Sequence, residues 1–167
     1  FDISGATIVD PAKSEKTDAY IAKLVELREK KGMTEEKARE LLLTNYLYYG
    51  VMMVKMKDAD GMVSGACHST ADTLRPSLLK TKPGTKLVSA FFIMVVQDCE
   101  MGANGTFLFG DSGLEQNPDP EKLAAIALSS ADSFRLLTEK EPVVALLSHS
   151  TKGSAKHADV DKVVEAT

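Results

Sequence analysis

One glycine-rich segment of the sequence, residues 58–76, combines residue types that bind phosphate groups in many proteins. Gly61 and Gly65 allow a ligand to approach the backbone closely, because glycine has no Cβ atom. Ser69 or Thr70 is a suitable N-cap for a following helix, whose first N–H groups carry partial positive charge. The segment therefore predicts an exposed site for a phosphate or a carboxylate, with an ordinary glycine-rich connection as the alternative.

Arg75 lies near the end of the same segment. Its guanidinium group is planar and permanently charged, so it matches the geometry of phosphoryl oxygens. Pro76 follows it and restricts its backbone. An ion pair with Asp72 is the simpler alternative for Arg75.

Other polar residues also adjoin the ends of predicted strands. The loop of residues 148–154 has the hydroxyls, lysine and glycine that suit an anion, but any surface loop offers polar residues and its glycine spacing is not that of a P-loop. His149 is expected at a strand end or a pocket rim. Asp60 and Asp111 each adjoin a glycine and are candidate bases, although such pairs are also common in turns.

The two cysteines and three histidines predict neither a disulfide framework nor a metal site. Cys67 and Cys99 match no zinc spacing, and the histidines show no ligand spacing with acidic partners. Cys67 beside His68 suggests a nucleophilic pair, but neighbours in sequence seldom point toward one another. We therefore expect reduced thiols and no covalent catalysis.

The composition is that of an ordinary globular domain. Of the 167 residues, 26% are charged and 44% are hydrophobic, and no apolar stretch reaches the roughly 18 residues of a membrane span. The net charge of −4 argues against nonspecific binding of nucleic acid, which favours a basic surface. We expect one cytoplasmic α/β region over residues 1–167, in which any polyanionic ligand needs a local cluster of arginine and lysine.

Segments in which hydrophobic residues recur every two residues alternate along the chain with segments in which they recur every 3.6 residues. This alternation of strand and helix patterns indicates an α/β fold. A hairpin turn is predicted at residues 102–105, and strands at 3–9, 85–97, 106–109 and 142–147, of which 85–97 is expected to be covered on both faces. Helices are predicted at 14–31, from Thr34 onward, at 43–55, from Asp119 onward and at 158–166.

The predicted order of elements also brings the polar segments together. Open α/β sheets bind ligands beyond the carboxyl ends of their strands. Residues 64–70, 110–112 and 148–154 are therefore expected to converge.

Five separated motifs, in order along the whole chain, resemble those of the phosphate acetyltransferases. They are REKKGMT at 28–34, YGVMM at 49–53, DGMVSG at 60–65, HSTADTLRP at 68–76 and STKGSA at 150–155. Ala71 departs from the glycine of many relatives, which a helical backbone tolerates. Phosphate butyryltransferases share the general pattern, so the acyl group stays open.

The resemblance implies a protein about twice as long, in which residues 1–167 form the central part of a two-domain acyltransferase. It also implies a three-layer αβα sheet with an inserted antiparallel hairpin, similar to the isocitrate and isopropylmalate dehydrogenases. The family has a Ser–Arg pair and an aspartate close to its C-terminus that this sequence does not include. We therefore expect the chain to carry part of an active site.

The resemblance further implies direct transfer of an acetyl group between coenzyme A and inorganic phosphate in a ternary complex. Arg75 is then the catalytic candidate, and Ser64, Ser69 and Thr70 join it at the phosphate end of acetyl phosphate. Arg28 resembles the family arginine that meets the phosphorylated ribose of coenzyme A. A solvated helix face is the simpler alternative for Arg28, since surface charges usually contribute little.

The partners that the resemblance implies are small molecules: coenzyme A, acetyl phosphate and phosphate. Coenzyme A is a substrate, and no tightly bound cofactor, metal, nucleic acid or membrane is expected. Family members are commonly homodimers, to which the apolar residues 46–56 could contribute. A noncatalytic acetyl-CoA-sensing domain, like that fused to some malic enzymes, and a plain folding and dimerisation unit are the alternatives.

Overall fold

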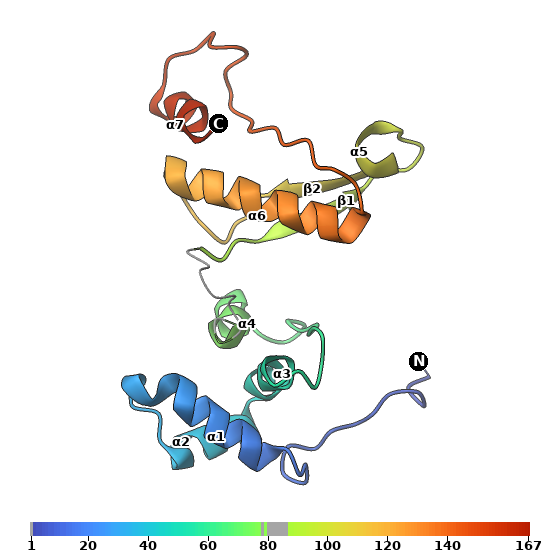
Figure 1. Cartoon of the computed structure of the whole chain (residues 1–167), viewed down its shortest axis with the longest axis vertical. Helices are drawn as coiled ribbons and strands as arrows, with labels where there is room; N and C mark the ends of the chain where they lie inside the picture. The colour runs from blue at the N-terminus through green and yellow to red at the C-terminus, as the bar shows by residue number, and fades with distance from the viewer. Residues whose placement is uncertain (1, 78, 80–86) are drawn as a thin grey trace. The chain divides into compact units, whose positions relative to one another are not determined.

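The computed structural model describes residues 2–77, 79 and 87–167 (Figure 1). They belong to two units, Phe1–Pro83 and Gly84–Thr167, each of which is described by itself. None of the helices in the described ranges combines the length and the apolar composition that a membrane crossing requires.

The first unit is helical. Its elements are α1 (Thr17–Arg28), the 3₁₀ turn η1 (Glu29–Lys31), α2 (Glu35–Thr44), α3 (Tyr46–Lys55) and α4 (Thr70–Ser77). Helix α1 begins three residues after the predicted cap, because Ser14 Oγ accepts a hydrogen bond from the N–H of Lys16 (3.3 Å) in the turn that precedes it. The predicted end of this helix after Lys31 is confirmed, because Gly32 adopts a φ of 75°, which glycine tolerates best.

Local capping explains the next two helices. Thr34 caps α2 as predicted, its hydroxyl accepting from the N–H of Lys37 (3.3 Å). The predicted helix over residues 43–55 is interrupted, because Asn45 is extended and its side chain accepts from the N–H groups of Leu47 (3.1 Å) and Tyr48 (3.3 Å). Asn45 therefore ends α2 and starts α3.

The core of the first unit lies where α1, α2 and α3 pack together. Tyr20 and Tyr49 meet edge to face with ring centroids 5.1 Å apart. The Tyr20 hydroxyl reaches the edge of this core and donates to Asp58 Oδ2 (2.6 Å), and Lys16 pairs with the other oxygen of Asp58. Burial, and then this bond to Asp58, raise the pKa of Tyr20. The buried residues of this core include Tyr20, Ile21, Leu24, Leu42, Tyr49 and Met52.

The second unit is built on a hairpin. Strands β1 (Phe91–Val95) and β2 (Thr106–Gly110) pair antiparallel, with Phe91 opposite Gly110 and Val95 opposite Thr106. The short α5 (Met101–Asn104) and Gly105 connect them, so the predicted hairpin is confirmed. Gly105 has a φ of 83°, and a Cβ atom there would collide with the carbonyl oxygen of Val96.

Two helices complete the second unit: α6 (Pro120–Thr138), which lies along β2, and α7 (Ala158–Ala166), which packs on α6 (Figure 1). The predicted start of α6 is confirmed, since Asp119 Oδ1 accepts from the N–H of Lys122 (2.8 Å) and Pro120 occupies the first turn. Ile126 is the buried residue of α6, whereas 58% of Leu137 is exposed.

Three strand predictions differ from the structure. Residues 3–9 and 142–147 are irregular and largely exposed, as Ile8 (81%) and Val143 (98%) illustrate. In the predicted strand 85–97, residues 85 and 86 lie outside the described residues, and β1 is exposed rather than covered on both faces. A strand forms only against a hydrogen-bonded neighbour, and the described residues supply one pair of strands. The chain is thus α/β in content, with helices and one small antiparallel sheet.

Candidate functional site

The N-terminus of α4 is built around Ser69. Its Oγ accepts from the N–H of Asp72 (3.2 Å) and donates to Asp72 Oδ2 (2.6 Å), which confirms Ser69 as the cap; Thr70 is the first helical residue. Both side chains are exposed. An anion bound at this helix start would meet the Asp72 carboxylate, which already complements the helix dipole.

Arg75 lies one turn further along α4 and is exposed. The hydrogen bond from Ser69 is the main cause that lowers the pKa of Asp72, and the positive charge of Arg75 lowers this pKa further. None of the ion pairs in the described part of the chain joins Arg75 to Asp72. The helix continues through Pro76, which is buried and anchors α4, while the neighbouring Arg75 is exposed.

The residues before α4 form an exposed, irregular segment that includes Ser64 and Asp60. Gly65 within it has a φ of 110°, a conformation that favours glycine. Cys67 and His68 do point toward one another, with Sγ 3.4 Å from Nδ1, so the expectation that these neighbours diverge is wrong. An exposed thiol next to an imidazole nitrogen is open to reaction with an electrophile.

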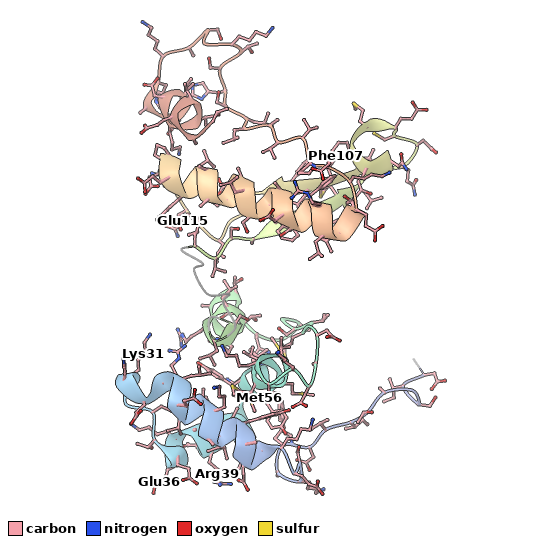
Figure 2. All side chains as sticks on the ribbon, in the orientation of Figure 1. Lys31, Glu36, Arg39, Met56, Phe107 and Glu115 are labelled. Carbon is pink, nitrogen blue, oxygen red and sulfur yellow. The ribbon has the colours of Figure 1, made fainter. Side chains whose placement is uncertain are left out.

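Arg28 ends α1 and is followed by Glu29, Lys30 and Lys31 of η1. It is half-buried, whereas Lys30 and Lys31 on η1 are exposed; Lys31 projects from the end of this turn (Figure 2). The side chain of Lys37 reaches the end of η1, because its Nζ donates to the carbonyl oxygen of Gly32 (3.3 Å). The structure thus gathers four cations at this end of α1, which we call the basic end. The sequence indicated Arg28, but the approach of Lys37 depends on the turn at Gly32.

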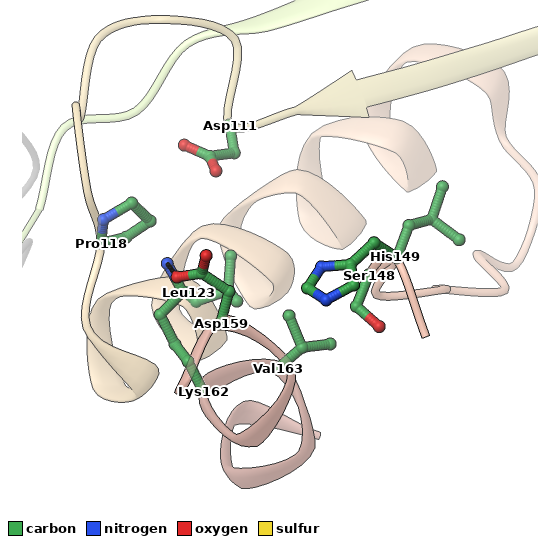
Figure 3. Close-up of a pocket in the computed structure, with 9 residues that line it drawn as sticks. Asp111, Pro118, Leu123, Ser148, His149, Asp159, Lys162 and Val163 are labelled. Carbon is green, nitrogen blue, oxygen red and sulfur yellow. Dashed lines mark ion pairs between the residues drawn. The ribbon is translucent and has the colours of Figure 1, made fainter. Parts of the chain in front are cut away.

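A pocket of about 200 Å³ opens in the second unit (Figure 3). Asp111, directly after β2, lines it together with Ser148 and His149 from the irregular segment before α7. Two of the three segments that were expected to converge therefore do so. His149 is confirmed as a pocket residue. Residues 64–70, the third segment, belong to the other unit.

Helix α7 supplies polar groups to this pocket that the sequence did not indicate. Asp159 and Lys162 line it, and Lys162 Nζ lies 4.0 Å from Asp159 Oδ1 and donates to Asn117 Oδ1 (3.0 Å). His157 caps α7, because its Nδ1 accepts from the N–H of Asp159 (3.1 Å), and its ring meets that of His149 edge to face at 5.5 Å. Only the spacing from Asp159 to Lys162 could have suggested that these two share a helix face.

The described residues contain no group of three or more His, Cys, Asp or Glu side chains arranged to hold a metal ion. The first unit offers cations and a helix start, and the second offers a polar pocket with carboxylates.

Comparison with known proteins gives a consistent result. The family model for phosphate acetyl/butaryl transferase matches residues 1–167. A phosphate acetyltransferase of Acetivibrio thermocellus is 55% identical over 99% of the chain, and one of Staphylococcus aureus is 46% identical over 99%. The chain spans about half the length of these curated relatives, 50% and 48% respectively.

Solved structures agree with the sequences. The EutD phosphotransacetylase from Staphylococcus aureus matches with a TM-score of 0.83 and 46% identity, over 99% of this chain and 48% of that one. A phosphotransacetylase from Streptococcus pyogenes matches with a TM-score of 0.81 and 39% identity, over 99% and 51%. The chain belongs to the phosphate acetyl/butaryl transferase family.

Proposed function

We propose that the protein to which this chain belongs transfers an acetyl group between coenzyme A and inorganic phosphate. The observation that carries the proposal is the family match over residues 1–167, together with relatives at up to 55% identity that are phosphate acetyltransferases. The family description also covers butyryl transfer, so butyryl phosphate is the competing substrate to test.

The reaction proceeds in a ternary complex without a covalent enzyme intermediate. A base takes the proton of the coenzyme A thiol, and the thiolate attacks the carbonyl carbon of acetyl phosphate. The C–S bond forms, the C–O bond to phosphate breaks, and phosphate leaves. Negative charge develops on the carbonyl oxygen and on the departing phosphate, so preorganised donors and cations accelerate this step.

In this proposal the first unit holds the phosphate end of acetyl phosphate. Arg75 provides the catalytic cation, and Ser64, Ser69 and Thr70 provide hydroxyl donors. The exposure of Arg75 on a helix anchored by buried Pro76 supports its role. The Ser69 hydroxyl is engaged with Asp72, so the ligand replaces that hydrogen bond when it binds.

Arg28 binds the phosphorylated ribose of coenzyme A, and the basic end of α1 supports this assignment. Coenzyme A is polyanionic, and the chain carries a net charge of −4, so its binding requires a local cluster of cations. Lys30, Lys31 and Lys37 provide that cluster beside Arg28.

The proposal includes the setting of this chain. Residues 1–167 form the central part of a longer two-domain acyltransferase with a three-layer αβα sheet, similar to the dehydrogenase-like fold. Coenzyme A is a substrate rather than a tightly bound cofactor, and the enzyme is a cytoplasmic homodimer of acetate metabolism.

The test is an assay of thioester formation from coenzyme A and acetyl phosphate by the full-length protein. Arg75→Ala should lower kcat/KM about a hundredfold, which is typical for removal of a group that stabilises developing charge. Arg39→Ala is the matched control, because Arg39 is an exposed helix arginine that pairs with Asp18 (2.9 Å) and Glu35 (3.5 Å). Full activity in Arg75→Ala would overturn the site assignment.

A calorimetric titration of the chain with coenzyme A tests Arg28. Arg28→Ala should weaken binding about fivefold or more, since a charged hydrogen bond contributes roughly 1 kcal/mol or more. Lys23→Ala is the control, because Lys23 is a cation of the same helix that pairs with Glu26 (2.7 Å). Equal weakening in both variants would mean that Arg28 acts only through net charge.

A further inference from the structure

Residues 56–69, which we call the α3–α4 segment, join these two helices (Figure 1) and are held to the start of α1 near their own beginning. Asp58 accepts a hydrogen bond from the Tyr20 hydroxyl on Oδ2 (2.6 Å) and pairs with Lys16 through Oδ1. These partners lie 38 and 42 positions earlier in the chain. The hydrogen bonds from Lys16 and then from Tyr20 lower the pKa of Asp58, so it accepts from both as a carboxylate at neutral pH.

The backbone at the end of α3 brings Asp58 to this contact. Lys57 adopts a φ of 67°, a left-handed conformation that is uncommon for a residue with a side chain. The N–H groups of Asp58 (2.8 Å) and Ala59 (3.3 Å) both donate to the carbonyl oxygen of Met53 on α3. An unfavourable conformation of this kind persists where the surrounding contacts determine it, and the two contacts of the Asp58 side chain do so here.

Met62 gives the α3–α4 segment a second anchor. Its side chain lies against Gly50 of α3, because a Cβ atom on that glycine would come within 2.7 Å of the Met62 sulfur. Met62 also packs on the buried core of the first unit. Residues 63–69, by contrast, are exposed. The segment is therefore held at two points on the core, and its exposed part follows directly after the second.

We propose that Asp58 is a positioning residue for the acetyl transfer. Through Tyr20 and Lys16 it sets where the α3–α4 segment leaves the core of the first unit. It thereby sets the place of Ser64 and of the cap of α4, the helix that carries Arg75. This inference rests on the proposed function, in which those residues meet the phosphate end of acetyl phosphate. Asp58 acts without touching the substrate.

The aromatic pair in the core provides matched variants. Tyr20→Phe removes the hydroxyl that binds Asp58 and keeps the ring that meets Tyr49 edge to face. Tyr49→Phe removes the hydroxyl that lies 3.2 Å from Thr17 Oγ1 and leaves the contacts of Asp58 in place. Both tyrosines belong to the same buried core, so the comparison separates positioning from a general loss of stability.

The first measurement is the thioester assay of the full-length protein at varied acetyl phosphate. Tyr20→Phe should lower kcat/KM about tenfold and Tyr49→Phe by less than about twofold, because a small misplacement of groups that contact the substrate slows the reaction strongly. Asp58→Ala should lower kcat/KM at least as much as Tyr20→Phe. Asp58→Asn should restore part of the activity, because its amide oxygen still accepts from the Tyr20 hydroxyl.

The second measurement is amide hydrogen exchange, which tests the anchor independently of activity. The N–H groups of Asp58 and Ala59 should exchange faster in Tyr20→Phe than in the parent or in Tyr49→Phe, because their bonds to Met53 open once the side chain is released. Unchanged exchange in Tyr20→Phe would overturn the inference, and so would equal losses of kcat/KM in the two tyrosine variants. An inactive parent would overturn the acetyl transfer and the positioning role together, and the exchange rates would still decide whether Asp58 holds the segment.

Discussion

Replacing Ser69 by alanine removes two hydrogen bonds at the start of α4. The Ser69 hydroxyl accepts from the N–H of Asp72 and donates to the Asp72 carboxylate at 2.6 Å. Loss of an N-cap costs about 1 kcal/mol. We therefore expect Ser69→Ala to lower the free energy of unfolding of the first unit by about 1 kcal/mol at pH 7.

The second bond makes this loss depend on pH. The hydrogen bond from Ser69 holds the pKa of Asp72 below its ordinary value of 3.8. A carboxylate with a lowered pKa contributes stability above its unfolded pKa and loses it as the pH falls through its folded pKa. The difference between the parent and Ser69→Ala should therefore narrow as the pH falls below 3.8, and the pKa of Asp72 should rise in the variant.

Thr34→Ala is the matched control, because the Thr34 hydroxyl caps α2 by accepting from a backbone N–H and has no carboxylate partner among its described contacts. Thr34→Ala should lower the free energy of unfolding by about 1 kcal/mol, and this loss should not change with pH. Urea unfolding monitored by tyrosine fluorescence measures both variants. All four tyrosines lie at positions 20, 46, 48 and 49, and the sequence has no tryptophan, so the signal reports on the first unit alone.

Two results would refute the reasoning. If Ser69→Ala and Thr34→Ala lowered the free energy of unfolding equally and independently of pH, the hydrogen bond from Ser69 to the Asp72 carboxylate would contribute nothing to stability. An unchanged Asp72 titration in Ser69→Ala, followed by NMR of its carboxyl carbon, would lead to the same conclusion.

Three further predictions concern other parts of the chain. Gly105→Ala should destabilise the second unit by about 1–3 kcal/mol more than Gly113→Ala, as measured by thermal unfolding followed by circular dichroism. Both glycines have a positive φ, but of the two only Gly105 lies where a Cβ atom would collide with backbone. Equal destabilisation in the two variants would contradict the collision. Leu24→Ala should cost about 2–5 kcal/mol in urea, since Leu24 is fully buried; a loss below 1 kcal/mol would place it outside the core. His68→Asn should slow alkylation of Cys67 by iodoacetamide, measured by mass spectrometry, because the imidazole Nδ1 lies 3.4 Å from the thiol sulfur; an unchanged rate would mean that the imidazole does not assist.

Features that depend on a few neighbouring residues could be predicted from the sequence. Helix starts at Thr34 and Asp119, and a cap at Ser69 or Thr70, could be predicted because a capping side-chain oxygen bonds an N–H only three residues ahead. The hairpin was equally local, since its turn residues and both strands are adjacent in the chain. Asn45 was overlooked because apolar residues surround it on both sides, although asparagine is itself a strong cap.

Features that depend on distant residues could not be predicted in the same way. Residues 3–9 and 142–147 have strand-like composition, but a strand also needs a hydrogen-bonded neighbour, which composition does not reveal. The pocket that Asp111 lines joins this residue to Ser148 and His149, which lie more than 35 positions further along the chain. The contribution of Lys162 to the pocket depends on how α7 packs on α6. The sequence indicated Asp111 and His149 separately, and only the packing of the second unit brings them to one pocket.

The exposed strand β1 has a consequence for how this chain behaves at high concentration. Residues 92–96 are five consecutive apolar residues, each 43–70% exposed, and β1 pairs with β2 along one edge while its other edge has no strand among the described residues. An open, apolar edge of this kind is a template for pairing between molecules. Self-association should therefore begin at β1, and a charged residue in place of Val95 would suppress it more effectively than the same charge on any of the helices.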